Sequence, residues 1–186
     1  MSKQVWKPGT MVYPLPAVMV SCGDMEKSNI ITVAWTGTIC TDPAMVYISV
    51  RPERYSYNMI KETGEFVINL TTKELARKTD FAGVKSGRDL DKFDKLKLTK
   101  EKASKVKAPL IKESPVNIEC KVTEIKELGT HHMFIAKVLA VDVDEKYLDE
   151  KGKFCLEKAN LITYSHGEYY EQGKNIGKFG FSVKKK

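Results

Sequence analysis

Short β-rich runs separated by turn signals dominate the chain, and one longer segment alternates apolar and polar residues as a half-buried β-strand does. This segment is Val116–Leu128, where one face carries Val116, Ile118, Cys120 and Val122. Gly129-Thr130 then supplies a turn, and residues 133–143 form a second long β-rich run. The pattern predicts a β-hairpin in the second half of the chain.

Four shorter β-rich runs come before this hairpin. They are enriched in Ile, Val, Thr and Trp, which favour a pleated, half-buried surface. Turn signals such as Thr41-Asp42-Pro43 separate them. The runs cover residues 17–22, 29–39, 45–50 and Glu65–Leu70.

Only short helices are predicted between these runs. Ser56 is a candidate cap for a helix over residues 57–62, which Gly64 would end. A second helix is predicted over residues 72–80, with its first residue as the cap. Residues 81–90 contain two glycines and are expected to form a loop.

Many short strands with two or three short helices predict a mainly β fold, a barrel or a sandwich, rather than a β-α-β layout. The 186 residues are expected to form a single domain, residues 1–186. No G-x-G-x-x-G follows a strand into a helix, and no P-loop is present. A nucleotide site of either type is therefore unsupported.

Composition and charge narrow the class of protein. An apolar fraction of 42% and a charged fraction of 30% are those of an ordinary globular protein. No apolar run reaches the length needed to span a bilayer, and the N-terminus lacks the apolar stretch of a secretory signal, so a cytoplasmic protein is expected. The four cysteines form no C-x-x-C pair, which argues against a zinc site and predicts reduced thiols.

The net charge of +7 attracts anions, and its location matters more than its sum. Much of the charge lies in residues 95–112 and 184–186, where lysines mix with glutamates but with few aromatic residues. Single-strand binders interleave basic residues with stacking aromatics. A solvated basic surface is therefore favoured over a nucleic-acid interface.

Residues 29–38, N-I-I-T-V-A-W-T-G-T, contain the first candidate binding cluster. A Thr-Gly-Thr step beside Trp35 lets backbone N–H groups approach a planar ligand closely. The alternative is a buried strand in which Trp35 is a core anchor.

Residues 51–57, R-P-E-R-Y-S-Y, contain the second cluster. Two arginines, one hydroxyl and a helix N-terminus suit a phosphate group. The alternative is a surface ion-pair cluster around Glu53.

Two further clusters are weaker. Residues 85–93, K-S-G-R-D-L-D-K-F, could close over an anion or form a solvated loop, and their secondary structure is ambiguous from residue 91 onward. His131 and His132 follow the predicted turn, where a histidine could donate to a ligand carbonyl or simply be exposed. No G-x-S-x-G elbow or carboxylate pair is recognisable, so catalysis would depend on a cofactor.

These blocks, in this order, resemble the flavin reductase-like family and its flavoredoxin branch. They are N-I-I-T-V-A-W-T-G-T-I-C-T-D-P, V-R-P-E-R-Y-S-Y, G-E-F-V-I-N-L, S-G-R-D-L-D-K-F and L-G-T-H-H-M-F-I-A, and the match runs from about residue 16 to residue 164. The resemblance implies a split β-barrel of Greek-key type. It also implies a homodimer with a non-covalent FMN near the interface of the two subunits.

The resemblance implies roles for eleven residues. Seven would lie around the flavin ring and its ribityl chain: Asn29, Trp35, Thr36, Gly37, Thr38, His131 and Tyr164. Four would lie at or near the phosphate: Arg51, Arg54, Ser56 and Lys92, the last from a loop. Cys40 falls close to the expected ring site, where a thiol role is a hypothesis.

The leading hypothesis is a redox flavoprotein, either a flavin reductase or an electron carrier. The electron donor would be NADH, NADPH or a redox protein partner. A second hypothesis is a module that binds flavin for storage or sensing without turnover. A third is a binder of nucleic acid or another anionic surface, with no membrane partner in any of the three.

Overall fold

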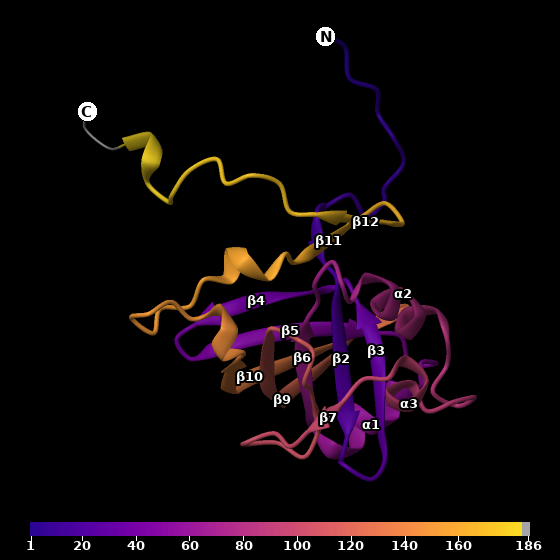
Figure 1. Cartoon of the computed structure of the whole chain (residues 1–186). Helices are drawn as coiled ribbons and strands as arrows, with labels where there is room; N and C mark the ends of the chain where they lie inside the picture. The colour runs from indigo at the N-terminus through magenta and orange to yellow at the C-terminus, as the bar shows by residue number, and fades with distance from the viewer. Residues whose placement is uncertain (184–186) are drawn as a thin grey trace.

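An antiparallel sheet of seven strands forms the body of the molecule (Figure 1), in the order β3-β2-β6-β9-β10-β5-β4. The computed structural model describes residues 1–183. The seven strands are β2 Val18–Gly23, β3 Ser28–Val33, β4 Thr36–Thr41, β5 Ala44–Val50, β6 Glu65–Leu70, β9 Val116–Leu128 and β10 His131–Val143. The predicted hairpin is confirmed, with Gly129 in the left-handed region at φ 66°.

The two edge strands of this sheet, β3 and β4, are consecutive in the chain. Only Ala34 and Trp35 separate them. The sheet must therefore curl until its two edges meet, and the result is a barrel that is split at one seam. The Ser49 N–H donates to the Trp35 carbonyl over 2.8 Å and fastens this link to β5. The single β-run predicted over residues 29–39 is thus interrupted at the seam.

Apolar side chains form three buried clusters because the central strands are buried on both faces. Along β2, Val18 and Val20 point into the curled sheet, where they join Phe66 and Phe134. Met19 points the other way, into a smaller core with other buried apolar residues. This double burial explains why the short strands read as nearly continuous apolar runs.

Three helices accompany the sheet: α1 Tyr55–Thr63, α2 Ala76–Val84 and α3 Lys92–Leu96. The predicted cap at Ser56 is wrong, because Arg54 holds the cap position and the Ser56 hydroxyl accepts from the Asn29 side chain. Gly64 ends α1 in the left-handed conformation, as predicted.

The second predicted helix is displaced along the chain. Thr72 pairs with Leu161 in an isolated bridge, so the chain is still extended at that residue. The helix begins only at Ala76 and runs to Val84, through the first part of the predicted loop. The ambiguous residues after 91 form α3, which Asp91 caps by accepting from the N–H groups of Phe93 and Asp94.

Two small sheets complete the fold. The strands β1 Leu15–Pro16, β11 Ile162–Ser165 and β12 Glu168–Glu171 form one of them, in the order β1-β11-β12. The strands β7 Lys100–Glu101 and β8 Leu110–Ile111 form the other. Short 3-10 turns lie at Glu145–Tyr147, Leu156–Ala159 and Phe181–Val183.

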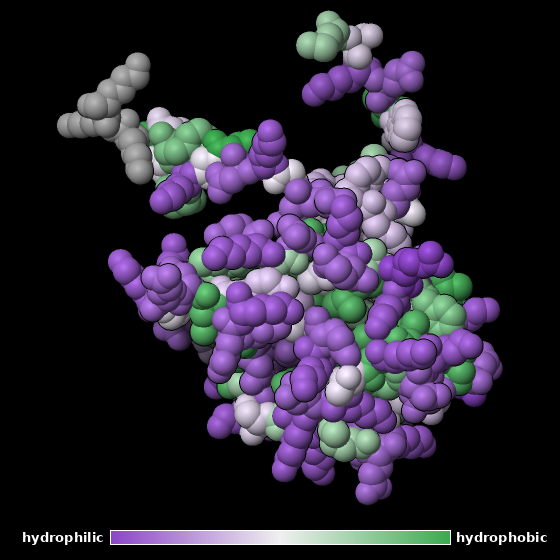
Figure 2. All heavy atoms as spheres, viewed as in Figure 1, coloured by the Kyte–Doolittle hydropathy of each residue, from purple (hydrophilic) through white to green (hydrophobic). Residues whose placement is uncertain are grey.

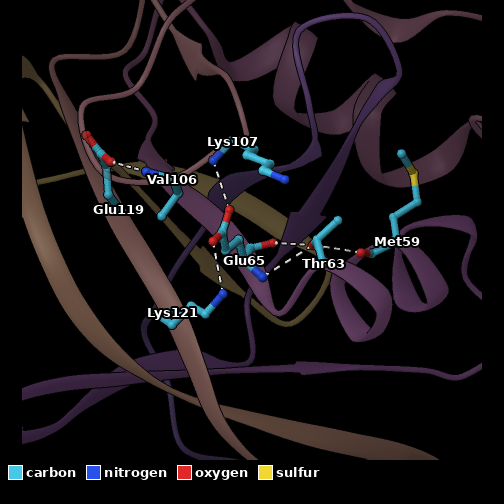
Figure 3. Close-up of polar contacts among 7 residues, drawn as sticks. All are labelled: Met59, Thr63, Glu65, Val106, Lys107, Glu119 and Lys121. Carbon is cyan, nitrogen blue, oxygen red and sulfur yellow. Dashed lines mark hydrogen bonds and ion pairs between the residues drawn. The ribbon is translucent and has the colours of Figure 1, made fainter.

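The lysine-rich segment between β7 and β8 is fastened to the sheet by two carboxylates (Figure 3). Glu119 on β9 is fully buried and accepts from the N–H and hydroxyl of Ser104 and from the N–H groups of Lys105 and Val106. Glu65 accepts from the Lys107 N–H over 2.9 Å. This segment is therefore an ordered part of the domain rather than a loose basic loop. Within residues 1–183, no helix is long and apolar enough to cross a membrane.

Candidate functional site

A cleft of about 440 Å³ opens at the seam of the barrel. Its inner wall is the end of β3 and the Ala34–Trp35 link, so the point where the sheet splits is also the floor of the site. Arg51, Glu53 and Arg54 lie on one side of it, and Tyr164 and Tyr169 of the small sheet lie on another.

Aromatic rings form one wall of the cleft. The indole of Trp35 and the imidazole of His131 are stacked, with 6.2 Å between centroids and 5° between planes. Tyr164 lies 6.5 Å from Trp35 and meets Tyr169 edge-to-face at 5.8 Å. Such a wall offers flat, polarisable surface to a planar ring.

The neutral form of His131 is favoured at the cleft wall. Burial lowers the pKa of its imidazole, and the nearby positive charge of Arg51 lowers it further. A neutral imidazole can either donate or accept a hydrogen bond at the cleft wall.

A second cavity, of about 150 Å³, adjoins the cleft and shares Ile31, Glu53 and Arg54 with it. Its other polar lining comes from three segments: the start of β3, the start of α1, and the loop between α2 and α3 with the first residue of α3. These polar residues are Asn29, Tyr55, Ser56, Lys85, Ser86, Arg88 and Lys92. We call this second cavity the cationic pocket.

Lys92 is the most unusual residue of the cationic pocket. Its side chain is 3% exposed, and its ammonium donates to the carbonyls of Ile30 and Ala82, both over 2.7 Å. Both acceptors are neutral, and within residues 1–183 no carboxylate forms an ion pair with it. Burial, together with the positive charge of Arg54, lowers its pKa to about 8.

Two buried polar side chains form the inner end of this pocket. The Asn29 amide donates to the Ser56 hydroxyl over 2.7 Å, and both residues are buried. The loop after α2 lies directly on them: a Cβ at Gly87 would stand 2.2 Å from Asn29 Oδ1 and 2.7 Å from Tyr55 Cδ1. Only glycine allows this close approach.

The three arginines of the site differ in how they are held. Arg54 donates to the Gly83 carbonyl and so lies between the two cavities. Arg88 donates to the Glu53 carbonyl over 3.0 Å and lies over the Tyr55 ring. Arg51 reaches Glu53 at 3.4 Å, and both side chains are mostly exposed.

The structure gathers eight of the eleven predicted site residues around the two cavities. Trp35, Arg51, His131 and Tyr164 line the cleft, Asn29, Ser56 and Lys92 line the cationic pocket, and Arg54 lines both. Lys92 lies on a helix rather than on the expected loop, because Asp91 caps that helix.

The Thr36, Gly37 and Thr38 step lines neither cavity. Thr36 is buried and its hydroxyl donates to the Tyr47 carbonyl over 2.7 Å, while Gly37 packs on the Tyr47 ring. Thr38 pairs with Val46 on β5. Cys40, on the same strand, also lies outside both linings.

Sequence reasoning missed several lining residues. Ser49 and Gly83 carry no distinctive pattern, and only the folded chain brings them to the cleft. Thr32 lies inside the first candidate cluster, but nothing in that block assigns it a role. Tyr169 lies in a polar segment near the C-terminus whose sequence indicates no binding site. The sequence around Lys85, Ser86 and Arg88 does indicate one, since the K-S-G-R block suggested an anion site, but composition alone favoured a solvated loop.

Comparison with known proteins agrees with this fold and site. Residues 10–172 match the flavin reductase like domain. Flavoredoxin of Desulfovibrio vulgaris (Miyazaki F) superposes with a TM-score of 0.90 over 98% of this chain and 100% of that chain, at 32% identity. Flavoredoxin from Methanosarcina acetivorans superposes with a TM-score of 0.87 over 97% of each chain, at 25% identity. A protein of Archaeoglobus fulgidus is 36% identical over 165 residues, which are 89% of this chain and 88% of that protein.

The chain therefore belongs to the flavin reductase-like family, a class of flavin-binding redox proteins with a split-barrel fold. The matches to two flavoredoxins over nearly the whole chain place it in the flavoredoxin branch of that family. The fold class predicted from the sequence is confirmed.

Proposed function

We propose that the chain binds FMN non-covalently and works as a redox flavoprotein, with the ring in the aromatic cleft and the phosphate in the cationic pocket. The observation that carries this proposal is Lys92, a buried ammonium with only neutral acceptors beside it. A desolvated charge of this kind is costly unless an opposite charge accompanies it. A bound phosphate would supply that charge.

The residues present fit such a cofactor. Arg54, Arg88 and Lys85 add cationic or N–H donors around the same pocket, and the Ser56 hydroxyl is a further donor. In the adjoining cleft, Trp35, His131 and Tyr164 offer ring faces and edges. FMN would supply reversible electron uptake.

The electron donor would be NADH, NADPH or a redox protein partner. Arg51 and Arg54, which line the cleft, would favour an anionic donor. We also propose that two copies form a homodimer around the flavin sites in the cytoplasm. Thr36, Gly37 and Thr38, which line neither cavity of one copy, would then take part at or near the subunit interface.

The test is to titrate apo-protein with FMN and with riboflavin, which lacks the phosphate, between pH 6.5 and 9.5 by flavin fluorescence. The phosphate dianion keeps its charge over this range, since its second pKa is about 6. Lys92 loses its proton above its pKa of about 8. FMN affinity should therefore be flat below pH 8 and fall by up to about ten-fold per pH unit above it. Riboflavin affinity should show no such fall.

Two variants complete this test. Lys92→Met should weaken FMN binding by about ten-fold or more and abolish the fall above pH 8. Lys95→Met, on the exposed side of the same helix, is the matched control and should change neither. Equal binding of FMN and riboflavin by the unaltered protein would contradict the phosphate site.

Anaerobic addition of NADH or NADPH to the FMN complex then separates the roles. Bleaching of the flavin band, with steady turnover when an electron acceptor is present, would identify a reductase. A band that bleaches only with a reduced protein or a chemical reductant would identify an electron carrier. Tight binding with no reduction by any of these would leave a storage or sensing module.

A further inference from the structure

The two terminal arms of the chain leave the same end of the molecule, beside β11 and β12 (Figure 1). The C-terminal arm, residues 172–183, follows β12 and stands clear of the barrel. Figure 2 shows apolar surface gathered on this arm, separate from the main body. We call residues 172–183 the tail.

The tail carries large apolar side chains that are exposed to solvent. Ile176 is 91% exposed, Phe179 107% and Val183 82%. The hydrogen bonds recorded for it within residues 1–183 are local, such as Phe181 N–H to the Lys178 carbonyl over 2.9 Å. Each large apolar side chain left in water forgoes about 1.5–3 kcal/mol. An apolar segment exposed in this way marks a contact with another surface.

An apolar groove of about 320 Å³ lies at the same end of the barrel. It runs between residues 9–13 of the N-terminal arm and the rings of Trp35 and Tyr47. Trp35 also lines the cleft at the seam of the barrel, so its indole separates the groove from the cleft. Whatever occupies the groove would support the ring wall of the site.

We propose that the tail of a second copy of this chain occupies this groove, so that each copy supports the aromatic wall of the other copy's cleft. The proposal rests on the homodimer proposed above and adds the segment that joins its subunits. Both the tail and the groove lie at one end of each copy, so a two-fold axis allows reciprocal exchange and closes the assembly at two chains. The tail stands clear of its own barrel, as an exchanged segment must.

The spacing of the tail fits an apolar, groove-filling role. Phe179 and Phe181 are large side chains. Gly177 precedes both of them, and Gly180 lies between them. The Phe181 ring already packs on Gly177, where a Cβ would stand 2.7 Å from it. The tail is therefore locally ordered before it docks, which lowers the conformational entropy that docking costs.

The test places a photo-cross-linking phenylalanine analogue at position 179 of the full chain. Protein labelled with ¹⁵N and carrying the analogue is mixed with unlabelled, unmodified protein, exchanged, and irradiated. Mass spectrometry should find the cross-link on peptides of residues 9–13 or on those with Trp35 or Tyr47, and from the unlabelled copy. Cross-links confined to one chain, or cross-links elsewhere, would overturn the proposal.

A second measurement reports on Trp35 directly. In a Trp6→Phe background Trp35 is the single tryptophan. Adding Ile176→Ser and Phe179→Ser should move Trp35 emission to longer wavelength and shift the dimer toward monomer in light scattering. The matched control, Lys174→Ser with Lys178→Ser, removes two charged side chains of the tail. It should change neither the Trp35 emission nor the mass in light scattering. Unchanged emission and mass in the apolar variant would also overturn the proposal.

FMN titration of the same samples keeps the two proposals apart. FMN binding without cross-links between copies would refute tail exchange alone. Cross-links between copies with no FMN binding would refute the proposed cofactor alone.

Discussion

Gly87 controls how closely the loop after α2 lies on the cationic pocket. A Cβ there would overlap Asn29 Oδ1 at 2.2 Å and Tyr55 Cδ1 at 2.7 Å, and both neighbours are held in place by the fold. Asn29 is itself bonded to Ser56 over 2.7 Å. The loop, rather than its neighbours, must therefore move when a methyl group is added.

We expect Gly87→Ala to weaken FMN binding by about ten-fold or more, since overpacking costs roughly 1–3 kcal/mol and here displaces Arg88 and Ser86 from the pocket. Riboflavin binding should change much less, because the ring cleft is untouched. Gly173→Ala, where nothing lies within 4 Å of the new Cβ, is the control. Titration by fluorescence measures both, and an unchanged FMN affinity would show that this loop does not hold the phosphate.

Glu119 holds residues 104–106 of the segment between β7 and β8. Burial alone would raise the pKa of Glu119, but the donors of Ser104 and Lys105 hold it below its ordinary value of 4.5. Glu119 therefore stabilises the fold above pH 4.5 and loses this contribution as the pH falls through its lowered pKa. Asp142 beside it has a raised pKa, through burial and the charge of Glu119.

We expect Glu119→Gln to lower the free energy of unfolding by about 2–3 kcal/mol at pH 7, because an amide accepts fewer and weaker hydrogen bonds from residues 104–106. Urea denaturation at several pH values measures this loss, which should shrink as the pH falls through the lowered pKa of Glu119. Glu124→Gln, exposed on the same strand, should cost less than about 0.5 kcal/mol. Equal losses in the two variants would contradict the role of Glu119.

How far the sequence predicts this fold depends on how local the cause of each element is. The hairpin of β9 and β10, with its turn at Gly129, follows from alternation and one glycine, so the pattern finds it. The start of α2 depends on Thr72 pairing with Leu161, which is 89 residues away, and no local pattern contains that. Likewise, Ser56 is a good cap by type but is used by Asn29.

The residues of the site can be predicted from the sequence only where local blocks contain them. Trp35, Arg51, Arg54 and Ser56 stand in compact blocks whose residue types indicate an aromatic wall and an anion cradle. Gly83 and Tyr169 reach the cleft only because α2 and the small sheet lie against the seam. Contacts of that kind follow from the topology of the whole chain.

Assembly and cofactor binding should be linked if the proposals above hold. A dimer that binds FMN more tightly than the monomer must itself be tightened by FMN, by the product of the affinity gains at its two sites. We therefore expect saturating FMN to lower the dimer dissociation constant by about ten-fold or more, measured by analytical ultracentrifugation. Because the dimer holds two flavin sites, the FMN affinity of each site should rise with protein concentration by the square root of that factor. Dimer dissociation constants that agree with and without FMN would refute the link.

The two-residue link between β3 and β4 has a consequence for how this protein can change over time. Ala34 and Trp35 close the barrel and also form the floor of the cleft at its seam. An inserted residue here would turn every later side chain of β4 to the opposite face, as a one-residue shift does in any strand. The length of this link is therefore not free to drift as loop lengths usually are. Descendants of this chain can vary its outer loops widely, but a new specificity at the cleft must come from substitutions in a seam of constant length.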